Sequence, residues 1–306
     1  MRIYPGTTVD YEFATLGGLG YTGTLNDRQF AALRAEGLTG SLADMFKQFD
    51  GTLGGGTPTL SEQVEAMLSG TTGFALDPSD TAIMWQDTGT VTPVTTTAHP
   101  IGHIQSKWGT TPRDFIQGTA GARPAWDGVA GMTFDGADDW LSIAASSLFQ
   151  NVPAVFASLS FICTSFAATP KPLFFSTNAT GAPRLEFSLT GNARTFGRIL
   201  DGDASTLITG SAALSTGVRY TLTGQINDAG DKAMQQWLDG ASDATGTNGG
   251  TLGNTSNTAA ARVNIGAGNA GAQFLPGKIG RIVACPFIPT VDQRSTIEAW
   301  INEVAL

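Results

Sequence analysis

Short apolar segments separated by turn residues fill the second half of the chain. From residue 131 onward, segments rich in Val, Ile, Leu and Phe alternate with turn sequences such as Asp135-Gly136 and Asp239-Gly240. This spacing is typical of antiparallel strands joined by hairpins and Greek-key connections. The pattern predicts strands over residues 132–134, 140–143, 155–166, 173–176, 184–189, 195–200, 219–226, 233–238, 262–265 and 277–284.

Helical spacing of apolar residues occurs near both ends of the chain. Residues 292–304 carry apolar side chains on one helical face, and either Thr290 or Asp292 can cap this helix. We expect it to close the β domain. Another helix is predicted over residues 60–68, with Ser61 as its cap.

A short repeat marks the N-terminal region. Residues 20–27 (Gly-Tyr-Thr-Gly-Thr-Leu-Asn-Asp) are echoed by residues 37–44 (Gly-Leu-Thr-Gly-Ser-Leu-Ala-Asp), and a short amphipathic stretch follows each copy. Helices this short bury too little surface to stand alone, so we expect residues 1–70 to be a docking or anchor region. Its docking residues would be Leu25, Phe30, Leu33, Leu42, Phe46 and Phe49.

Composition and charge narrow the class of partner. The 306 residues are 41% hydrophobic, enough for a buried core, and only 14% charged. The formal net charge is −9, with no cluster of Lys and Arg, so a nucleic-acid backbone would meet repulsion. No segment has the length and apolarity of a membrane span or the form of a secretion signal, so we expect neither membrane insertion nor export.

Four segments of the C-terminal part resemble, in order, parts of concanavalin A-like/laminin-G-like domains. Residues 131–141 (Gly-Met-Thr-Phe-Asp-Gly-Ala-Asp-Asp-Trp-Leu) resemble their opening strand, and residues 236–240 (Gln-Trp-Leu-Asp-Gly) resemble a characteristic hairpin. Residues 263–268 and 274–282 resemble the closing strands, which a short helix follows. The resemblance covers residues 125–306 and implies a mainly β fold, an antiparallel jelly-roll β-sandwich.

The upstream sequence carries a second resemblance. Residues 71–124, expected to be an irregular lead-in segment, are similar around Phe74, Met84 and Pro100 to a segment that precedes such domains in phage and prophage structural proteins. The polar loop usual there is replaced by Ser-Lys-Trp-Gly-Thr at residues 106–110. The N-terminal repeat is similar to short modules of phage virion proteins. The resemblance implies a bacteriophage head or tail fibre, spike or decoration protein.

Two tryptophans are candidates for binding sugar. An indole face offers apolar contact to a sugar ring, and neighbouring amides and carboxylates can bond its hydroxyls. The candidate carbohydrate-binding residues are Trp140, Trp237, Asp138, Asp139 and Gln236. Packing in the core or at an edge is the alternative role for both rings.

Three carboxylates lie close together in the same sequence segment. Asp135, Asp138 and Asp139 could supply oxygen ligands to Ca²⁺, or they could form a solvated turn held by Asx hydrogen bonds. We expect no other cofactor.

No catalytic constellation is evident. Jelly-roll glycoside hydrolases use paired carboxylates, but Glu186 is the only glutamate in the predicted strands. Its partner would have to be a turn residue such as Asp201, Asp203 or Asp239. We therefore assign no catalytic residue.

These observations predict a structural virion protein assembled in the cytoplasm of a bacterial host. Its N-terminal region would join other virion proteins of the capsid, portal or tail, as a homo-oligomer on the particle. Its β domain would project and bind a host-surface glycan. The alternatives are a capsid or tail cement protein without a ligand and a carbohydrate-active enzyme.

Overall fold

The computed structural model describes residues 58–109, 113–143, 152–167, 171–177, 183–198, 206–249, 262–268 and 273–306. Within it, Leu60–Leu306 form one compact unit. The six predicted docking residues, between positions 25 and 49, lie outside the described residues. Residues 60–70, expected to belong to the docking region, lie inside the compact unit.

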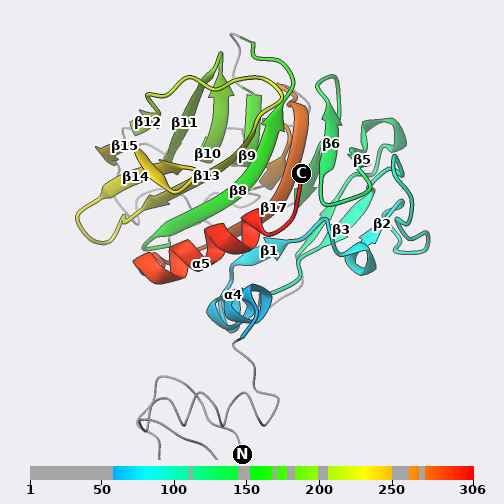
Figure 1. Ribbon diagram of the computed structural model, residues 1–306, viewed down its shortest axis with the longest axis horizontal. Helices are drawn as coiled ribbons and strands as arrows, with labels where there is room; N and C mark the ends of the chain where they lie inside the picture. The colour runs from blue at the N-terminus through cyan, green and yellow to red at the C-terminus, as the bar shows by residue number, and fades with distance from the viewer. Residues whose placement is uncertain are drawn as a thin grey trace, which may run out of the picture. The chain divides into compact units, whose positions relative to one another are not determined.

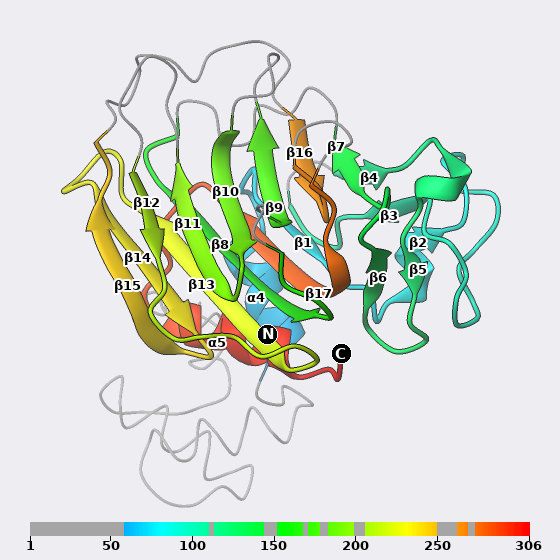
Figure 2. The ribbon, with the colours of Figure 1, turned by 90° about the horizontal axis from the view of Figure 1, so that it is seen from above.

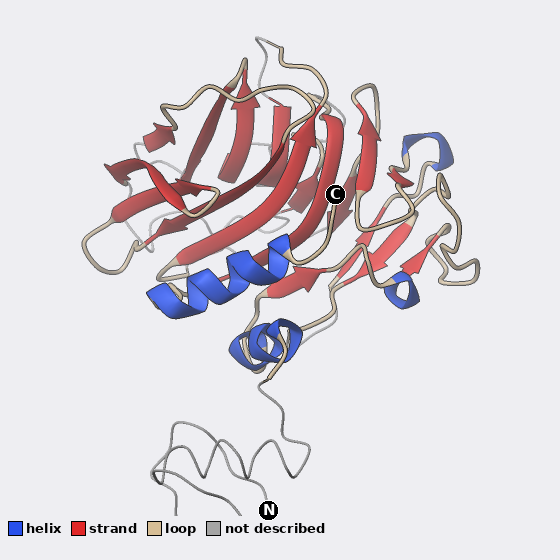
Figure 3. Ribbon diagram, viewed as in Figure 1, coloured by secondary structure: helices blue, strands red, loops and turns tan. Residues whose placement is uncertain are grey.

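Two antiparallel sheets form a β-sandwich, as the sequence predicted (Figures 1 and 3). The eight-stranded sheet has the order β15 (Ala241–Thr247), β14 (Ala233–Leu238), β13 (Arg219–Ile226), β8 (Val155–Cys163), β17 (Pro276–Cys285), β6 (Met132–Asp135) and β5 (Ala125–Trp126). Strand β1 (Phe74–Leu76) pairs with the last part of β17.

The nine-stranded sheet faces the first one (Figure 2). Its order is β12 (Thr206–Thr209), β11 (Ala193–Arg198), β10 (Pro183–Thr190), β9 (Lys171–Thr177), β16 (Arg262–Ile265), β7 (Leu141–Ile143), β4 (Asp114–Ile116), β3 (His103–Gln105) and β2 (Met84–Trp85). Strands from the expected lead-in segment therefore belong to both sheets. Two short 3₁₀ helices, η1 (Thr81–Ile83) and η2 (Ala120–Ala122), lie between these early strands.

A single apolar core fills the space between the sheets. Phe134, Phe161 and Leu222 are at most 2% exposed and belong to this core, together with Leu141 from the facing sheet. Their strands alternate inward apolar residues with outward residues, because successive side chains of a strand point to opposite faces. The core is thus the physical reason for the apolar periodicity seen in the sequence.

Two helices cover the outer face of the eight-stranded sheet. Helices α4 (Leu60–Leu68) and α5 (Val291–Asn302) share an apolar cluster with that sheet, to which Val64, Phe156 and Trp300 belong, all of them 0% exposed (Figure 1). The capping box of α5 uses Thr290, which confirms one of the two predicted caps. Ser61 lies inside α4, and its hydroxyl accepts a hydrogen bond from the indole of Trp300 at 3.1 Å.

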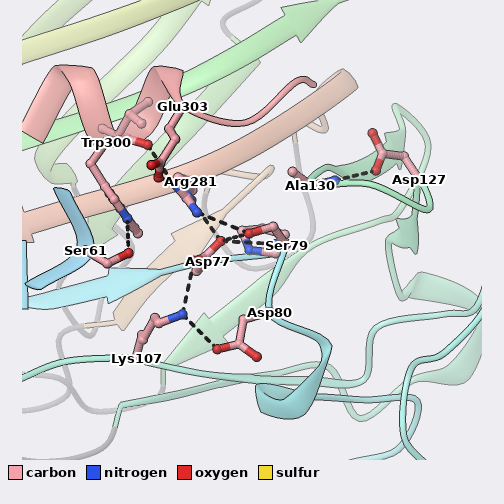
Figure 4. A network of polar contacts seen from close by, with 12 residues as sticks. Ser61, Asp77, Ser79, Asp80, Lys107, Asp127, Ala130, Arg281, Trp300 and Glu303 are labelled. Atoms are coloured by element: carbon pink, nitrogen blue, oxygen red, sulfur yellow. Dashed lines mark hydrogen bonds and ion pairs between the residues drawn. The ribbon is translucent and has the colours of Figure 1, made fainter. Parts of the chain in front are cut away.

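A buried arginine connects α5, β17 and the segment after β1 (Figure 4). The register between β17 and β8 shifts between Ile279 and Ile282, and Arg281 lies within this irregularity. Its guanidinium donates to Asp77 at 2.9 Å and to the carbonyl of Trp300 at 2.6 Å, and it lies 4.4 Å from the Trp300 ring centroid. Asp77, only 1% exposed, depends on this arginine and on Lys107 for compensation of its charge.

A second buried ion pair joins the two sheets near their edge strands β12 and β15. Arg194 on β11 pairs with Asp243 on β15, and Gln236 of β14 donates to the same carboxylate at 2.6 Å. Arg194 and Gln236 are 0% exposed. Gly210 permits this approach, because a Cβ atom there would lie 2.0 Å from an Asp243 oxygen. The pair holds the strands β11, β14 and β15 together across the sandwich.

The described helices bear on the expectation about membranes. None of them combines the length and the apolarity needed to cross a membrane.

Candidate functional site

The loop between β6 and β7 brings three carboxylates together, as the sequence suggested. One oxygen each of Asp135, Asp138 and Asp139 lies within 4.8 Å of the others. Gly136 allows the tight turn with a φ of +80°, and Asp135 accepts the backbone N–H of Ala137 at 2.7 Å. This geometry therefore fits both possibilities: three oxygens that could converge on a cation, and a turn held by Asx hydrogen bonds.

The three carboxylates do not share one electrostatic environment. Burial raises the pKa of Asp135, but hydrogen bonds from backbone N–H groups outweigh it, so this pKa is below its usual value. Asp139 is only 7% exposed. Its burial, together with the charges of Asp135 and Asp138, raises its pKa to about 6, although the backbone N–H of Asp135 partly opposes this shift. A cation bound here would relieve that repulsion.

The Asp139 carboxyl should make stability depend on pH between about 4 and 6. Its folded pKa of about 6 exceeds the ordinary 3.8, so ionisation in this window costs the folded state and stability falls as pH rises. We expect Asp139→Asn to remove this fall and to stabilise the protein at pH 7 by about 1–2 kcal/mol, a figure reduced for solvent screening of a loop carboxylate. Chemical unfolding at a series of pH values measures it.

Asp138→Asn is the comparison variant, because Asp138 is exposed in the same turn and its charge is the smallest of the causes that raise the Asp139 pKa. It should change stability by less than about 0.5 kcal/mol. Identical pH profiles for Asp139→Asn and the unsubstituted protein would show that Asp139 titrates normally. If the cluster binds Ca²⁺, adding the ion should raise the melting temperature of the unsubstituted protein but not that of Asp139→Asn.

Trp140 follows the acidic turn directly and stands beside a cation. Its indole is partly exposed, and the guanidinium of Arg262 lies 5.7 Å from the ring centroid. The backbone fixes its position, because Gln117 donates to the Trp140 carbonyl at 3.2 Å and the Trp140 N–H donates to Ala122 at 3.2 Å. An aromatic surface, a guanidinium and three carboxylates thus meet at one end of β7.

Trp237 and Gln236 lie elsewhere and do not join this group. They belong to β14, in the other sheet. Trp237 is 6% exposed and lies under the guanidinium of Arg294 on α5, 4.1 Å from its ring centroid. Gln236 points into the sandwich, where it bonds Asp243. The expectation that Trp237 offers a free ring face is therefore not met, because α5 covers it, whereas Trp140 remains available.

Sequence reasoning missed the polar residues beside Trp140. Ser142 on β7 and Asn264 on β16 are register partners, and both point away from the apolar core. Ser142 is 8% exposed and Asn264 is 0% exposed. Arg262 precedes Asn264 by two residues and therefore shares its face of the sheet. The polar residue within each short apolar strand was the available signal.

Glu186 lies on the same outer face, on β10. Burial raises its pKa, and a hydrogen bond from Ser188 partly lowers it. Of the acids considered as its catalytic partner, Asp239 follows β14 of the other sheet and accepts the Thr221 N–H at 2.7 Å. Asp201 and Asp203 lie outside the described residues. Among these three acids the structure therefore shows none placed as a partner of Glu186.

Comparisons with known proteins found matches among solved structures alone. No family model and no curated protein matches the chain. Among solved structures, the heptameric SAP-like pentraxin of Limulus polyphemus is 15% identical, with a TM-score of 0.42 over 55% of this chain and 81% of its own. The CBM40 domain of Ruminococcus gnavus IT-sialidase, bound to α2,3-sialyllactose, is 18% identical, with a TM-score of 0.43 over 55% of this chain and 93% of that domain. The receptor-binding domain of botulinum neurotoxin mosaic serotype C/D is 8% identical, with a TM-score of 0.49 over 75% of this chain and 51% of that domain.

Proposed function

We propose that the β-sandwich binds a carbohydrate of a bacterial surface at Trp140. The observation that carries this proposal is the partly exposed indole beside Arg262 and the acidic turn. Burial of the apolar face of a sugar ring against an indole is favourable. The guanidinium and the carboxylates can form hydrogen bonds with the hydroxyls of the sugar. Asp138 and Asp139 are the nearest candidates for such bonds.

We also propose that the chain is a structural component of a virion. The resemblance of the N-terminal repeat and of residues 71–124 to phage proteins supports this role. A sparse apolar set in residues 1–59 would suit attachment to capsid, portal or tail proteins better than independent folding. Several copies on one particle would turn weak contacts with sugars into firm adhesion through high effective concentration.

Replacing Trp140 by Ala should weaken glycan binding about five- to thirtyfold, because a stacked ring contributes on the order of 1–2 kcal/mol. The full-length protein is applied to an array of bacterial-surface polysaccharides, and the strongest ligands are then titrated by calorimetry. Trp237→Phe is the matched control. Because α5 covers the Trp237 ring, this substitution should leave the affinity for glycan unchanged.

The array also separates the alternatives. Equal binding by Trp140→Ala and the unsubstituted protein would place the site elsewhere, and binding to no glycan would favour the cement-protein role. Release of reducing ends from a bound polysaccharide would favour an enzyme. Labelling of purified phage particles with an antibody against the chain tests the virion role independently.

A further inference from the structure

One arginine in the described part of the chain has no oxygen to bond. The other arginines whose side chains the structure describes all donate to a carbonyl or carboxylate oxygen: Arg113, Arg123, Arg194, Arg219, Arg281 and Arg294. Arg262 is partly exposed, and its contact is with the ring of Trp140 instead. Its guanidinium therefore keeps its donors available for a ligand.

Arg262 and Trp140 approach each other from opposite ends of the β7–β16 pair (Figure 2). Leu141 and Ile265 are partners in this antiparallel ladder and lie in the core, so the odd spacing of Trp140 and Arg262 from them places both on the outer face. Along the strands the two positions are about 13 Å apart. Because the guanidinium is only 5.7 Å from the ring centroid, the two side chains lean toward each other.

The indole and the guanidinium form the accessible surface at this place. Ser142 and Asn264 lie between them on the same face and are 8% and 0% exposed, whereas Trp140 and Arg262 are partly exposed. A ligand therefore meets Trp140 and Arg262 first, and it needs no opening into the sheet.

The guanidinium borders the indole and does not stack tightly on it. Its distance of 5.7 Å from the Trp140 centroid compares with 4.1 Å and 4.4 Å in the two Arg–Trp pairs that involve α5. Cation–π attraction holds Arg262 beside the ring. Its planar fork of N–H donors matches the planar pair of oxygens in a carboxylate.

The charges around Trp140 favour a ligand group with a single negative charge. The charges that affect the pKa of Asp139 are those of Asp135 and Asp138, and that of Arg262 is not among them. The acidic turn therefore leaves Arg262 uncompensated. A carboxylate would balance this one cation, whereas a phosphate monoester would bring excess negative charge close to three carboxylates in a chain of net charge −9.

We infer that the Trp140 site selects a carboxylated sugar, whose ring stacks on the indole and whose carboxylate accepts hydrogen bonds from Arg262. This inference rests on the proposed carbohydrate binding and narrows its ligand to one chemical class. Hydroxyls at the opposite edge of the sugar would donate to the acidic turn, because ionised carboxylates only accept hydrogen bonds. The acceptor and donor ends of the ligand would thus fix one orientation on the ring.

Acidic glycans with and without their charge test the inference. Polygalacturonate, alginate and hyaluronate are presented to the full-length protein in the native form and as methyl esters, which lack the charge and keep the shape of the sugar. Oligosaccharides of the polymer that binds best are then titrated by calorimetry. We expect the native form to bind about three- to tenfold more tightly than the ester, and the difference to shrink at high salt.

Variants locate the preference. Arg262→Met should lower the affinity for the native form to that for the ester and leave the ester unaffected. Arg262→Lys should keep only part of the preference, because lysine retains the charge without the planar fork, and it remains informative if Arg262→Met unfolds. Arg113→Met is the matched control, since it removes the same charge from another partly exposed arginine and should keep the preference. Trp140→Ala should weaken both forms alike.

The outcomes separate this inference from the proposed function. Equal affinity for the native and ester forms, binding of neutral glycans alone, or a preference that survives Arg262→Met overturns the selection of carboxylates and leaves carbohydrate binding at Trp140 intact. Failure of the unsubstituted protein to bind any glycan, neutral or acidic, overturns both. A preference that is lost in Arg262→Met and kept in Arg113→Met supports the inference.

Discussion

Replacing Asp243 by Ala should lower the free energy of unfolding by about 3–5 kcal/mol, because it leaves the guanidinium of Arg194 buried without its counter-charge. Arg194 is 0% exposed and its Nε lies 2.6 Å from the Asp243 carboxylate, so no solvent compensates the loss. Gln236 would lose its partner as well. Urea unfolding followed by tryptophan fluorescence measures the change.

The double variant Arg194→Met with Asp243→Leu is the decisive comparison. Apolar side chains of similar volume can replace a buried ion pair at little cost, so the double variant should recover most of the stability lost by Asp243→Ala. If both proteins were equally destabilised, packing and not charge would govern this edge. An exposed carboxylate such as Asp138 supplies the baseline, since its replacement should change little.

Replacing Arg281 by Met should cost about 3–5 kcal/mol, because Asp77 would then be buried without its main partner. Arg281 also bonds the Trp300 carbonyl and lies over the Trp300 ring, so its loss removes the polar link between α5 and β17. Burial raises the pKa of Asp77, but the hydrogen bonds from Arg281 and Ser79 and the charges of Arg281 and Lys107 together outweigh it, and the net pKa is lowered. This stabilisation is present above the ordinary pKa of Asp and is lost as pH falls.

The pH dependence checks the mechanism. The stability difference between Arg281→Met and the unsubstituted protein should be largest at neutral pH and should shrink below about pH 4, as Asp77 becomes protonated. Glu303→Gln is the matched control, because Glu303 bonds the same arginine at 3.0 Å but its side chain is 47% exposed. It should cost less than about 1 kcal/mol. A difference independent of pH would contradict the role of the Asp77 charge.

Strands with apolar periodicity were predictable from the sequence, and polar strands were not. The predicted bounds 219–226, 233–238 and 262–265 agree with β13, β14 and β16. Strand β15, with the sequence Ala-Ser-Asp-Ala-Thr-Gly-Thr, was missed because an edge strand with mostly accessible side chains needs no apolar alternation. The pairing of β1 with β17 could not be foreseen, since register between distant segments leaves no local pattern.

The candidate site was predictable in part. The acidic turn and Trp140 are adjacent in sequence, so their proximity in space followed directly. Trp140 and Trp237 could not be told apart, because what distinguishes them is Arg294 on α5, a tertiary contact. The shared outer face of Asn264 and Glu186 was invisible for the same reason, as it follows only from the pairing of both strands with β9.

The position of β17 has a consequence for the order in which the chain acquires its structure. This strand follows every other described strand in the chain, yet it lies between β8 on one side and β6 and β1 on the other. All the other strands of the eight-stranded sheet must therefore leave the ribosome before this sheet can close. Until then β8 and β6 present unpaired backbone edges, which are sites of aggregation, and distant contacts of this kind form slowly. Synthesis in the cell should consequently yield a cooperative folding step that begins only when β17 has emerged.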